Sequence, residues 1–287
     1  MRVGLFAPFT NPFATPEYIE AYGRGAESRG FSSLWVAEHV VLFDEYASQY
    51  PYSADGKIPA GGESGIFEPF TALAFLAACT TTIRLGTGIC LVPQRNPVYT
   101  AKEVAAVDWL SNGRMDFGIG VGWLEEEFRA VDVPFPRRGA RTREYIEVMR
   151  RLWEDDISEH KGEFYELPAL RQYPKPVQRP HPPIHIGGES EAALRRVAQF
   201  GQGWYGFSVA PEDVPGRVAR LTELLDAEER TRSEIEVSIC PYLLGADADT
   251  VKRYEDAGVD QVILLGLGFD IPGLEAELDR IATMAGL

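Results

Sequence analysis

One histidine stands at the end of an apolar run, directly after a glutamate. The sequence SLWVAEHVV places Glu38 and His39 at the end of a strand predicted over residues 33–38. A histidine exchanges a proton near neutral pH, and a neighbouring carboxylate can orient its ring. His39 is therefore a candidate for proton transfer to or from a bound ring, with Glu38 as its partner. A histidine that only bonds a loop carbonyl is an equally good interpretation of this position.

Two glycines and a serine join another predicted strand to a helix. In PPIHIGGES, Gly187 and Gly188 let the backbone approach a ligand closely, and Glu189 and Ser190 lead into the helix. Free N–H groups at a helix N-terminus bind anions, and a serine there caps the helix. This spacing suits a single phosphate monoester better than a pyrophosphate, although an ordinary strand-to-helix turn has the same pattern.

Two further segments carry glycines where a strand is predicted. In MDFGIGVGW the pattern is GxGxG rather than the dinucleotide-binding GxGxxG, and no Walker A lysine is present. We interpret Gly120 and Gly122 as a second backbone wall of the same site, with Trp123 at its flank; close packing of strands is the alternative.

The segment LGTGICLVPQRNP has glycines inside a strand predicted over 84–91. Glycine within a strand usually marks a bulge or a place where another group approaches the backbone. Gly88, Ile89 and Cys90 are therefore candidates for contact with a ligand, unless the glycines only let a helix pack closely.

Charged residues cluster before and within the helix predicted over 138–155. The basic cluster suits either an anionic ligand tail or a solvated helix end. Its members are Arg137, Arg138, Arg141 and Arg143. The glutamates at 125–127 open a shorter helix, where negative charge suits the helix dipole, so we predict a structural role for them.

Short apolar runs and helical segments alternate in about eight steps, the count of a (β/α)8 TIM barrel. Strands are predicted at 2–8, 33–38, 84–91, 114–120, 184–186, 204–207, 235–243 and 261–265. Active sites of such barrels lie at the C-terminal ends of the strands, where the glycine segments and His39 fall. The loop at about 44–64 and a hairpin at 157–167 are predicted insertions, and an open doubly wound α/β sheet is the alternative fold.

Length and charge narrow the function further. The chain has 287 residues, 45% of them apolar, and a formal net charge of −15, and we expect one domain over residues 1–287. An acidic protein is a poor partner for nucleic acid or for an anionic membrane. Three separated cysteines predict no disulfide, and the four histidines lack metal-binding spacing. Neither a signal peptide nor an apolar span is predicted, which favours a cytoplasmic protein.

Together these motifs resemble the luciferase-like flavin and deazaflavin oxidoreductases, specifically the branch that uses coenzyme F420. The resemblance covers nearly the whole chain and is densest over 73–153 and 182–204. It implies a (β/α)8 barrel with insertions, a homodimer, and a cofactor ring against a non-proline cis peptide bond between Gly88 and Ile89. It also implies a cofactor phosphate at Gly187, Gly188 and Ser190, with the Gly120–Gly122 turn nearby, and His39 as the residue that handles the proton.

By this resemblance the protein transfers a hydride between C5 of the deazaflavin F420 and a small organic substrate. One alternative is an FMN-dependent two-component monooxygenase, which would need a separate flavin or F420 reductase as its partner. Another is a non-catalytic protein that binds a flavin or deazaflavin. Glu38 stands where sugar-phosphate-oxidising relatives have aspartate, so no particular substrate is implied.

Overall fold

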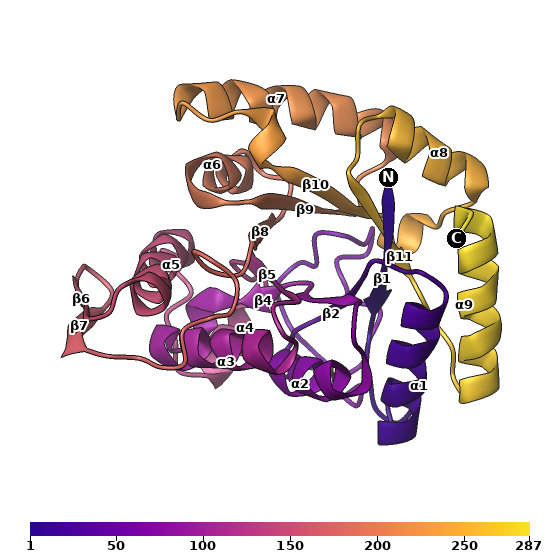
Figure 1. Ribbon diagram of the computed structural model, residues 1–287, viewed down its shortest axis with the longest axis horizontal. Helices are drawn as coiled ribbons and strands as arrows, with labels where there is room; N and C mark the ends of the chain where they lie inside the picture. Colours follow the sequence, from indigo (N-terminus) through magenta and orange to yellow (C-terminus); the bar gives the residue numbers. More distant parts are fainter.

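Short runs of β-branched, leucine and aromatic residues form the strands of the main sheet. The computed structural model describes residues 1–287 (Figure 1). The strands are β1 (Arg2–Ala7), β2 (Ser33–Val36), β3 (Arg84–Thr87), β4 (Cys90–Leu91), β5 (Met115–Gly120), β8 (Ile184–Gly187), β9 (Gly203–Phe207), β10 (Glu236–Cys240) and β11 (Gln261–Leu265).

These strands pair in the order β3-β2-β1-β11-β10-β9-β8-β5, and a further pairing of β5 with β3 closes the sheet. The pairs are parallel; Leu5 of β1, for example, lies beside Leu34 of β2 and Leu264 of β11. β3 and β4 both pair with β5, one after the other along its length, so together they occupy one strand position in the barrel. The fold is therefore the predicted (β/α)8 barrel.

Helices follow the strands and cover the outside of the barrel (Figure 1). Polar residues cap the first turns of several helices. Thr15, Asn96 and Ser190 each accept a hydrogen bond from a backbone N–H of the turn that follows. The helices are α1 (Pro16–Ser28), α2 (Pro69–Cys79), α3 (Pro97–Leu110), α4 (Glu125–Ala130), α5 (Arg138–Glu154), α6 (Glu191–Phe200), α7 (Val214–Ala227), α8 (Ala248–Asp256) and α9 (Ile271–Ala285).

Apolar side chains form two separate cores. The larger lies between the strands and the helices and buries residues such as Leu5 and Leu34 completely. The smaller is formed by barrel-strand residues: Phe6, Trp35, Tyr205, Cys240 and Ile263. Buried side chains at the other end of the strands are polar: Gln261 accepts a hydrogen bond from Ser33 (2.8 Å). The barrel is thus filled by side chains, with its apolar interior toward the C-terminal ends of the strands.

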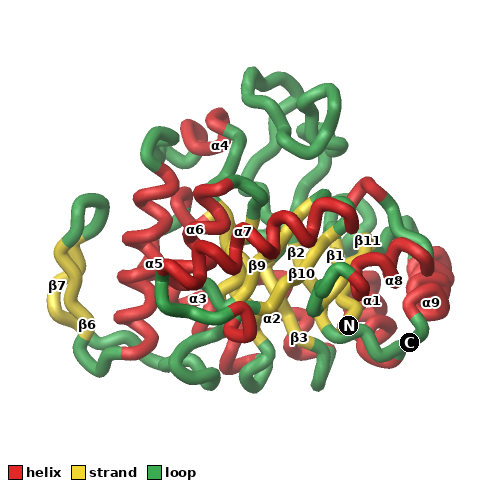
Figure 2. The backbone as a smooth tube through the Cα atoms, turned by 90° about the horizontal axis from the view of Figure 1, so that it is seen from above, coloured by secondary structure: helices red, strands yellow, loops and turns green.

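Two insertions depart from the barrel plan. Residues 37–68, between β2 and α2, form a long loop without a helix or a strand (Figure 2). The antiparallel pair β6 (Ser158–Lys161) and β7 (Glu166–Leu170) stands to one side of the barrel in both views. Both insertions were expected from the sequence, at slightly different bounds. No helix combines the length and the apolar composition that crossing a membrane requires.

The strand predicted over 84–91 is interrupted in the structure. β3 ends at Thr87, β4 begins at Cys90, and the peptide bond between Gly88 and Ile89 is cis. The cis bond that the family resemblance implied is therefore present, at the predicted position.

Candidate functional site

Glycines from three strands form a floor without side chains at the C-terminal end of the barrel. They are Gly88, which follows β3, and the last residues of β5 and β8, Gly120 and Gly187. A Cβ atom on Gly120 would lie 2.1 Å from Cδ1 of Ile89, and one on Gly187 would lie 3.1 Å from Cγ2 of Ile89. A side chain at either position would therefore press against the Ile89 side chain, which lies across the floor. The structure thus brings together segments that the sequence predicted to share one site.

Cys90 does not present its side chain to this floor. It is fully buried in the larger core, where burial raises the pKa of its thiol well above the ordinary value. The prediction that Cys90 contacts the ligand can therefore apply only to its backbone.

His39 lies next to Trp123, with the two ring centroids 6.0 Å apart. Its Nδ1 is 3.2 Å from Oε2 of Glu127, and the side chains of His39 and Glu127 are 11% and 1% exposed. An ionised carboxylate only accepts hydrogen bonds, so this contact assigns the hydrogen of the neutral ring to Nδ1. Nε2 is then left to exchange a proton with a bound molecule.

Glu127 is a site residue that the sequence analysis missed. Its carboxylate accepts hydrogen bonds from the backbone N–H of Val40 (2.7 Å) and from the Gln94 amide (3.0 Å). Glu127 therefore contacts His39, a contact that the predicted structural role at the start of α4 did not include. A signal was present: Leu124, Glu127 and Phe128 have the i, i+3, i+4 spacing of a buried helix face, and all three are buried.

Glu38 does not orient His39, contrary to the sequence-based hypothesis. Its buried carboxylate accepts a hydrogen bond from the N–H of Leu91 (2.5 Å) and another from Nε of Arg95 (2.6 Å). Arg95 also pairs with Glu68 and Glu103. Glu38 therefore fixes the end of β4 through a partly exposed ion-pair cluster around Arg95, and Glu127, not Glu38, contacts His39.

Replacing Glu38 by glutamine should destabilise the protein without removing the proton carrier. The change leaves the buried Arg95 with two partners instead of three, and we expect a loss of about 2 kcal/mol in unfolding free energy. Urea unfolding measures the loss. Glu63→Gln, on the exposed part of the long loop, is the control; an equal effect of the two changes would contradict the assignment.

The glycine-serine turn after β8 leads directly into α6. Gly188 has φ +105°, a value that favours glycine, and Ser190 caps α6 by accepting from the N–H of Ala193 (3.2 Å). The Glu189 carboxylate is already hydrogen-bonded within the protein: it accepts from the N–H of Phe207 (2.7 Å) and from the Tyr52 hydroxyl (3.0 Å). Burial raises the pKa of Glu189. A ligand anion would thus meet backbone N–H groups here.

Arginines without acidic partners lie beside the second glycine segment. Arg138 donates from Nε to the carbonyl of Gly122 (2.9 Å). The pKa of the Arg196 guanidinium is lowered, mainly because the group is buried and also because the positive charges of Arg143 and Arg138 lie near it. The buried Nε of Arg196 has no hydrogen-bond partner. None of these three arginines forms an ion pair with a carboxylate. In a protein of net charge −15, three arginines that form no ion pair are candidates for binding an anion.

Two of the four arginines predicted for an anionic tail serve other purposes. Arg137 forms an ion pair with Glu163 of the β6–β7 hairpin. Arg141 is buried and donates to the carbonyl of Pro134 (2.7 Å). Arg196 of α6 takes their place in the cluster. Because Arg196 comes from a helix more than fifty residues further along, the local sequence gave no indication of it.

Acidic residues tether the long loop over the site. Glu126 accepts from the N–H of Ala47 (2.7 Å) and from the Ser48 hydroxyl (2.7 Å). Rings of the loop pack on the site: the Tyr50 centroid lies 5.2 Å from that of Trp123, and the Tyr52 centroid lies 4.8 Å from that of Phe207. The loop therefore covers the C-terminal end of the barrel, as a lid over the site would.

Glu126→Ala should loosen this loop, because it removes the acceptor of the Ala47 and Ser48 amides. We expect faster hydrogen exchange at these amides and faster proteolysis of the loop. Burial raises the pKa of Glu126, but hydrogen bonds from Ser48 and Ala47 lower it more, from 4.5 to about 2. The tether should therefore be complete above pH 4.5 and weaken as the pH falls through about 2. Glu125→Ala is the control, and equal exchange in both variants would refute the tether.

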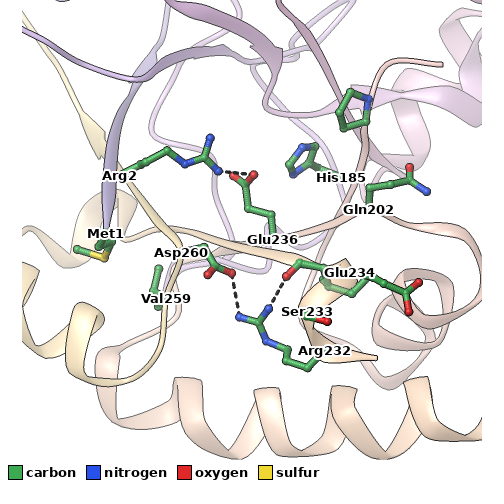
Figure 3. Close-up of a pocket in the computed structure, with 12 residues that line it drawn as sticks. Met1, Arg2, His185, Gln202, Arg232, Ser233, Glu234, Glu236, Val259 and Asp260 are labelled. Atoms are coloured by element: carbon green, nitrogen blue, oxygen red, sulfur yellow. Dashed lines mark hydrogen bonds and ion pairs between the residues drawn. The ribbon is translucent and has the colours of Figure 1, made fainter. Parts of the chain in front are cut away.

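A cavity of about 780 Å³ opens at the opposite, N-terminal end of the barrel (Figure 3). Its charged groups are paired with one another: Arg2 with Glu236, and Arg232 with Asp260. That end of a TIM barrel serves stability rather than chemistry. The floor, His39 and the free arginines all lie at the other end, which is where we place the functional site.

Comparisons with known proteins identify the family of the chain. The family model for luciferase-like monooxygenase matches residues 1–264. An uncharacterized protein of Mycobacterium tuberculosis is 34% identical over 249 residues, which are 87% of this chain and 84% of that protein. The oxygenase component of the flavin-dependent trigonelline monooxygenase of Acinetobacter baylyi is 34% identical over 179 residues, which are 61% of this chain and 44% of that protein.

Solved structures share the fold over the whole chain. Monooxygenase RslO1 from Streptomyces bottropensis superposes with a TM-score of 0.79 at 22% identity, covering 99% of this chain and 98% of that one. The coenzyme F420-dependent tetrahydromethanopterin reductase from Methanopyrus kandleri superposes with a TM-score of 0.76 at 18% identity, covering 99% and 97%. At these identities the likeness concerns the fold alone.

Proposed function

The chain belongs to the luciferase-like monooxygenase family, and on that premise we propose that it is an oxidoreductase that transfers a hydride between coenzyme F420 and a small organic substrate. The family comprises oxidoreductases and monooxygenases, so the choice of cofactor depends on the site itself. The observation that carries the proposal is the cluster of Arg138, Arg143 and Arg196, which has no acidic partner.

The residues present fit such a cofactor. The partly exposed Ile89 side chain, which packs over Gly120 and Gly187, offers an apolar surface to a flat ring, and the N-terminus of α6 after Gly188 offers N–H groups for a phosphate. FMN carries a single phosphate, which this turn alone could bind. The deazaflavin carries in addition a polyglutamyl tail, an extended polyanion, and the buried unpartnered Nε of Arg196 supplies a donor for it. The arginine cluster therefore favours F420 over FMN.

When bound, the deazaflavin supplies a two-electron hydride donor or acceptor. The protein's own residues do the rest. The glycine floor and the arginines orient the cofactor, and the loop with Tyr50 and Tyr52 excludes water from the site. Nε2 of His39 takes up or releases the proton of the substrate oxygen, while Glu127 holds the Nδ1 hydrogen and stabilises the charged ring.

Glu127→Gln should impair this proton transfer through His39. The amide can still accept from Nδ1 but carries no negative charge, so we expect turnover to fall roughly tenfold. Because this loss acts through His39, Glu127→Gln should have little further effect on kcat in a His39→Gln background. A further tenfold loss in the double variant would contradict the role.

The second candidate function is an FMN-dependent monooxygenase that works with a separate reductase. The observation in its favour is the identity of 34% to the oxygenase component from Acinetobacter baylyi. The two functions differ in their use of oxygen.

An oxygen electrode separates them. Protein loaded with F420 is offered a panel of secondary alcohols and ketones, with and without air. The proposal expects equal rates and no oxygen consumption. Turnover that requires oxygen, FMN and a flavin reductase would refute it in favour of the second candidate, and tight F420 binding without any turnover would indicate a carrier.

We also propose a homodimer, supported by exposed apolar residues on α2 and α3. Phe75, Tyr99, Trp109 and Leu110 are 39%, 74%, 56% and 64% exposed, and burying such side chains against a second copy would stabilise a dimer. Light scattering with Trp109→Glu tests this: the change should produce monomers, and a wild-type monomer would refute the proposal.

A further inference from the structure

The end of the barrel that carries the site has two chemically different halves. One half, around β5 and β8, has the glycine floor and the arginines. The other half, formed by β1, β9, β10 and β11, is apolar. Its wall consists of Phe6, Phe207, Tyr242 and Leu265, which pack on the smaller core around Trp35. The two halves cannot therefore bind the same kind of group.

The apolar wall is continuous. The centroid of Phe207 lies 4.6 Å from that of Tyr242 and 5.9 Å from that of Phe6, and Phe6 and Tyr242 are 6.0 Å apart. The carboxylate beside this wall belongs to Glu189, which already accepts two hydrogen bonds. The wall therefore offers a ligand contact area without a free charge, whether positive or negative.

Exposed apolar side chains continue the wall outward, along the loops that follow the same strands. Phe13 follows β1, Leu243 and Leu244 follow β10, and Leu267 and Phe269 follow β11. Phe13 and Phe269 contact each other with centroids 5.1 Å apart, although they are 42% and 70% exposed. Exposed apolar side chains on these loops offer contact area to an apolar ligand that enters the site.

We propose that the substrate is an uncharged molecule with an extended alkyl or aryl portion. This portion lies against Phe6, Phe207, Tyr242 and Leu265, and the reacting oxygen points toward Nε2 of His39. The inference rests on the proposed function, because it assigns the arginine half to the cofactor and leaves only the apolar half to the substrate.

Calorimetric titration with 2-alkanones, from 2-butanone to 2-decanone, tests the proposal on the F420-loaded protein. Burial of each added methylene should tighten binding about fourfold, the equivalent of about 0.8 kcal/mol. Phe207→Asn should reduce this dependence on chain length, and Phe207→Leu should keep most of it. Ile157→Asn, an exposed apolar residue at the β6–β7 hairpin, is the control and should leave it unchanged.

Charged molecules of similar chain length test the requirement for an uncharged substrate. Decanoate and decyltrimethylammonium should bind more weakly than 2-decanone. Tighter binding of either one would overturn the proposal, and so would an affinity of the wild type that does not depend on chain length. The F420 titration that precedes each experiment reports on the proposed function separately. A protein that binds no F420 would refute that function, whereas one that binds F420 without dependence on chain length would refute only the substrate class.

Discussion

Replacing His39 by glutamine is expected to lower kcat by roughly 10²- to 10⁴-fold, the usual contribution of a general acid or base. Glutamine retains a polar side chain of similar size but cannot exchange a proton at the atom that faces the substrate. Because His39 contacts Trp123 and Glu127 rather than the arginines, we expect the affinity for F420 to change by no more than about twofold.

The measurement is the rate of F420 reduction or reoxidation with the best substrate of the alcohol and ketone panel. His160→Gln is the matched control, since His160 is also buried but lies in the β6–β7 hairpin. Imidazole added to His39→Ala should restore part of the turnover. If kcat of His39→Gln matched that of the wild type, His39 would have no role in proton transfer.

Removing Arg138 and Arg196 together should weaken F420 binding by roughly 10²- to 10⁴-fold. Charge-assisted hydrogen bonds contribute roughly 1.5–3 kcal/mol each, and each guanidinium that contacts the anionic tail should contribute accordingly. The double variant should also lose much of the salt dependence of binding, because fewer charges remain to be screened. Calorimetry at low and high salt measures both effects.

Arg195→Ala is the control for this experiment. Arg195 lies on α6 next to Arg196, but it is exposed and pairs with Glu191, so its removal should change the affinity by no more than about twofold. A double variant that binds F420 as tightly as the wild type would mean that the arginine cluster does not hold the tail.

The barrel could be predicted from the sequence because its strands and helices are each specified by patterns within a short stretch of residues. Alternating apolar runs and capped helices, such as α6 behind Ser190, predicted strand and helix positions to within a few residues. The three glycine segments were also recognisable, because glycine in or next to a strand usually marks a bulge or a close approach to the backbone. Their convergence on Ile89 followed from the barrel rule that strand C-termini share one end.

The partners of the site residues could not be predicted in the same way. Glu38 precedes His39 in the chain, yet alternation along an extended segment sends the two side chains in different directions, and Glu38 meets Arg95 instead. Glu127 reaches His39 from α4, and Arg196 joins Arg138 from α6. These contacts depend on how elements distant in the sequence pack together, which no local pattern records.

Parallel calorimetric titrations of the wild-type protein with F420 and with FMN test the central claim most directly, since they need no substrate. The claim is that the glycine floor and the arginine cluster together bind a deazaflavin with a polyanionic tail. It predicts that F420 binds at least about tenfold more tightly than FMN at low salt, a difference of about 1.4 kcal/mol that shrinks as salt is added. Micromolar binding of FMN with no detectable binding of F420 would contradict it.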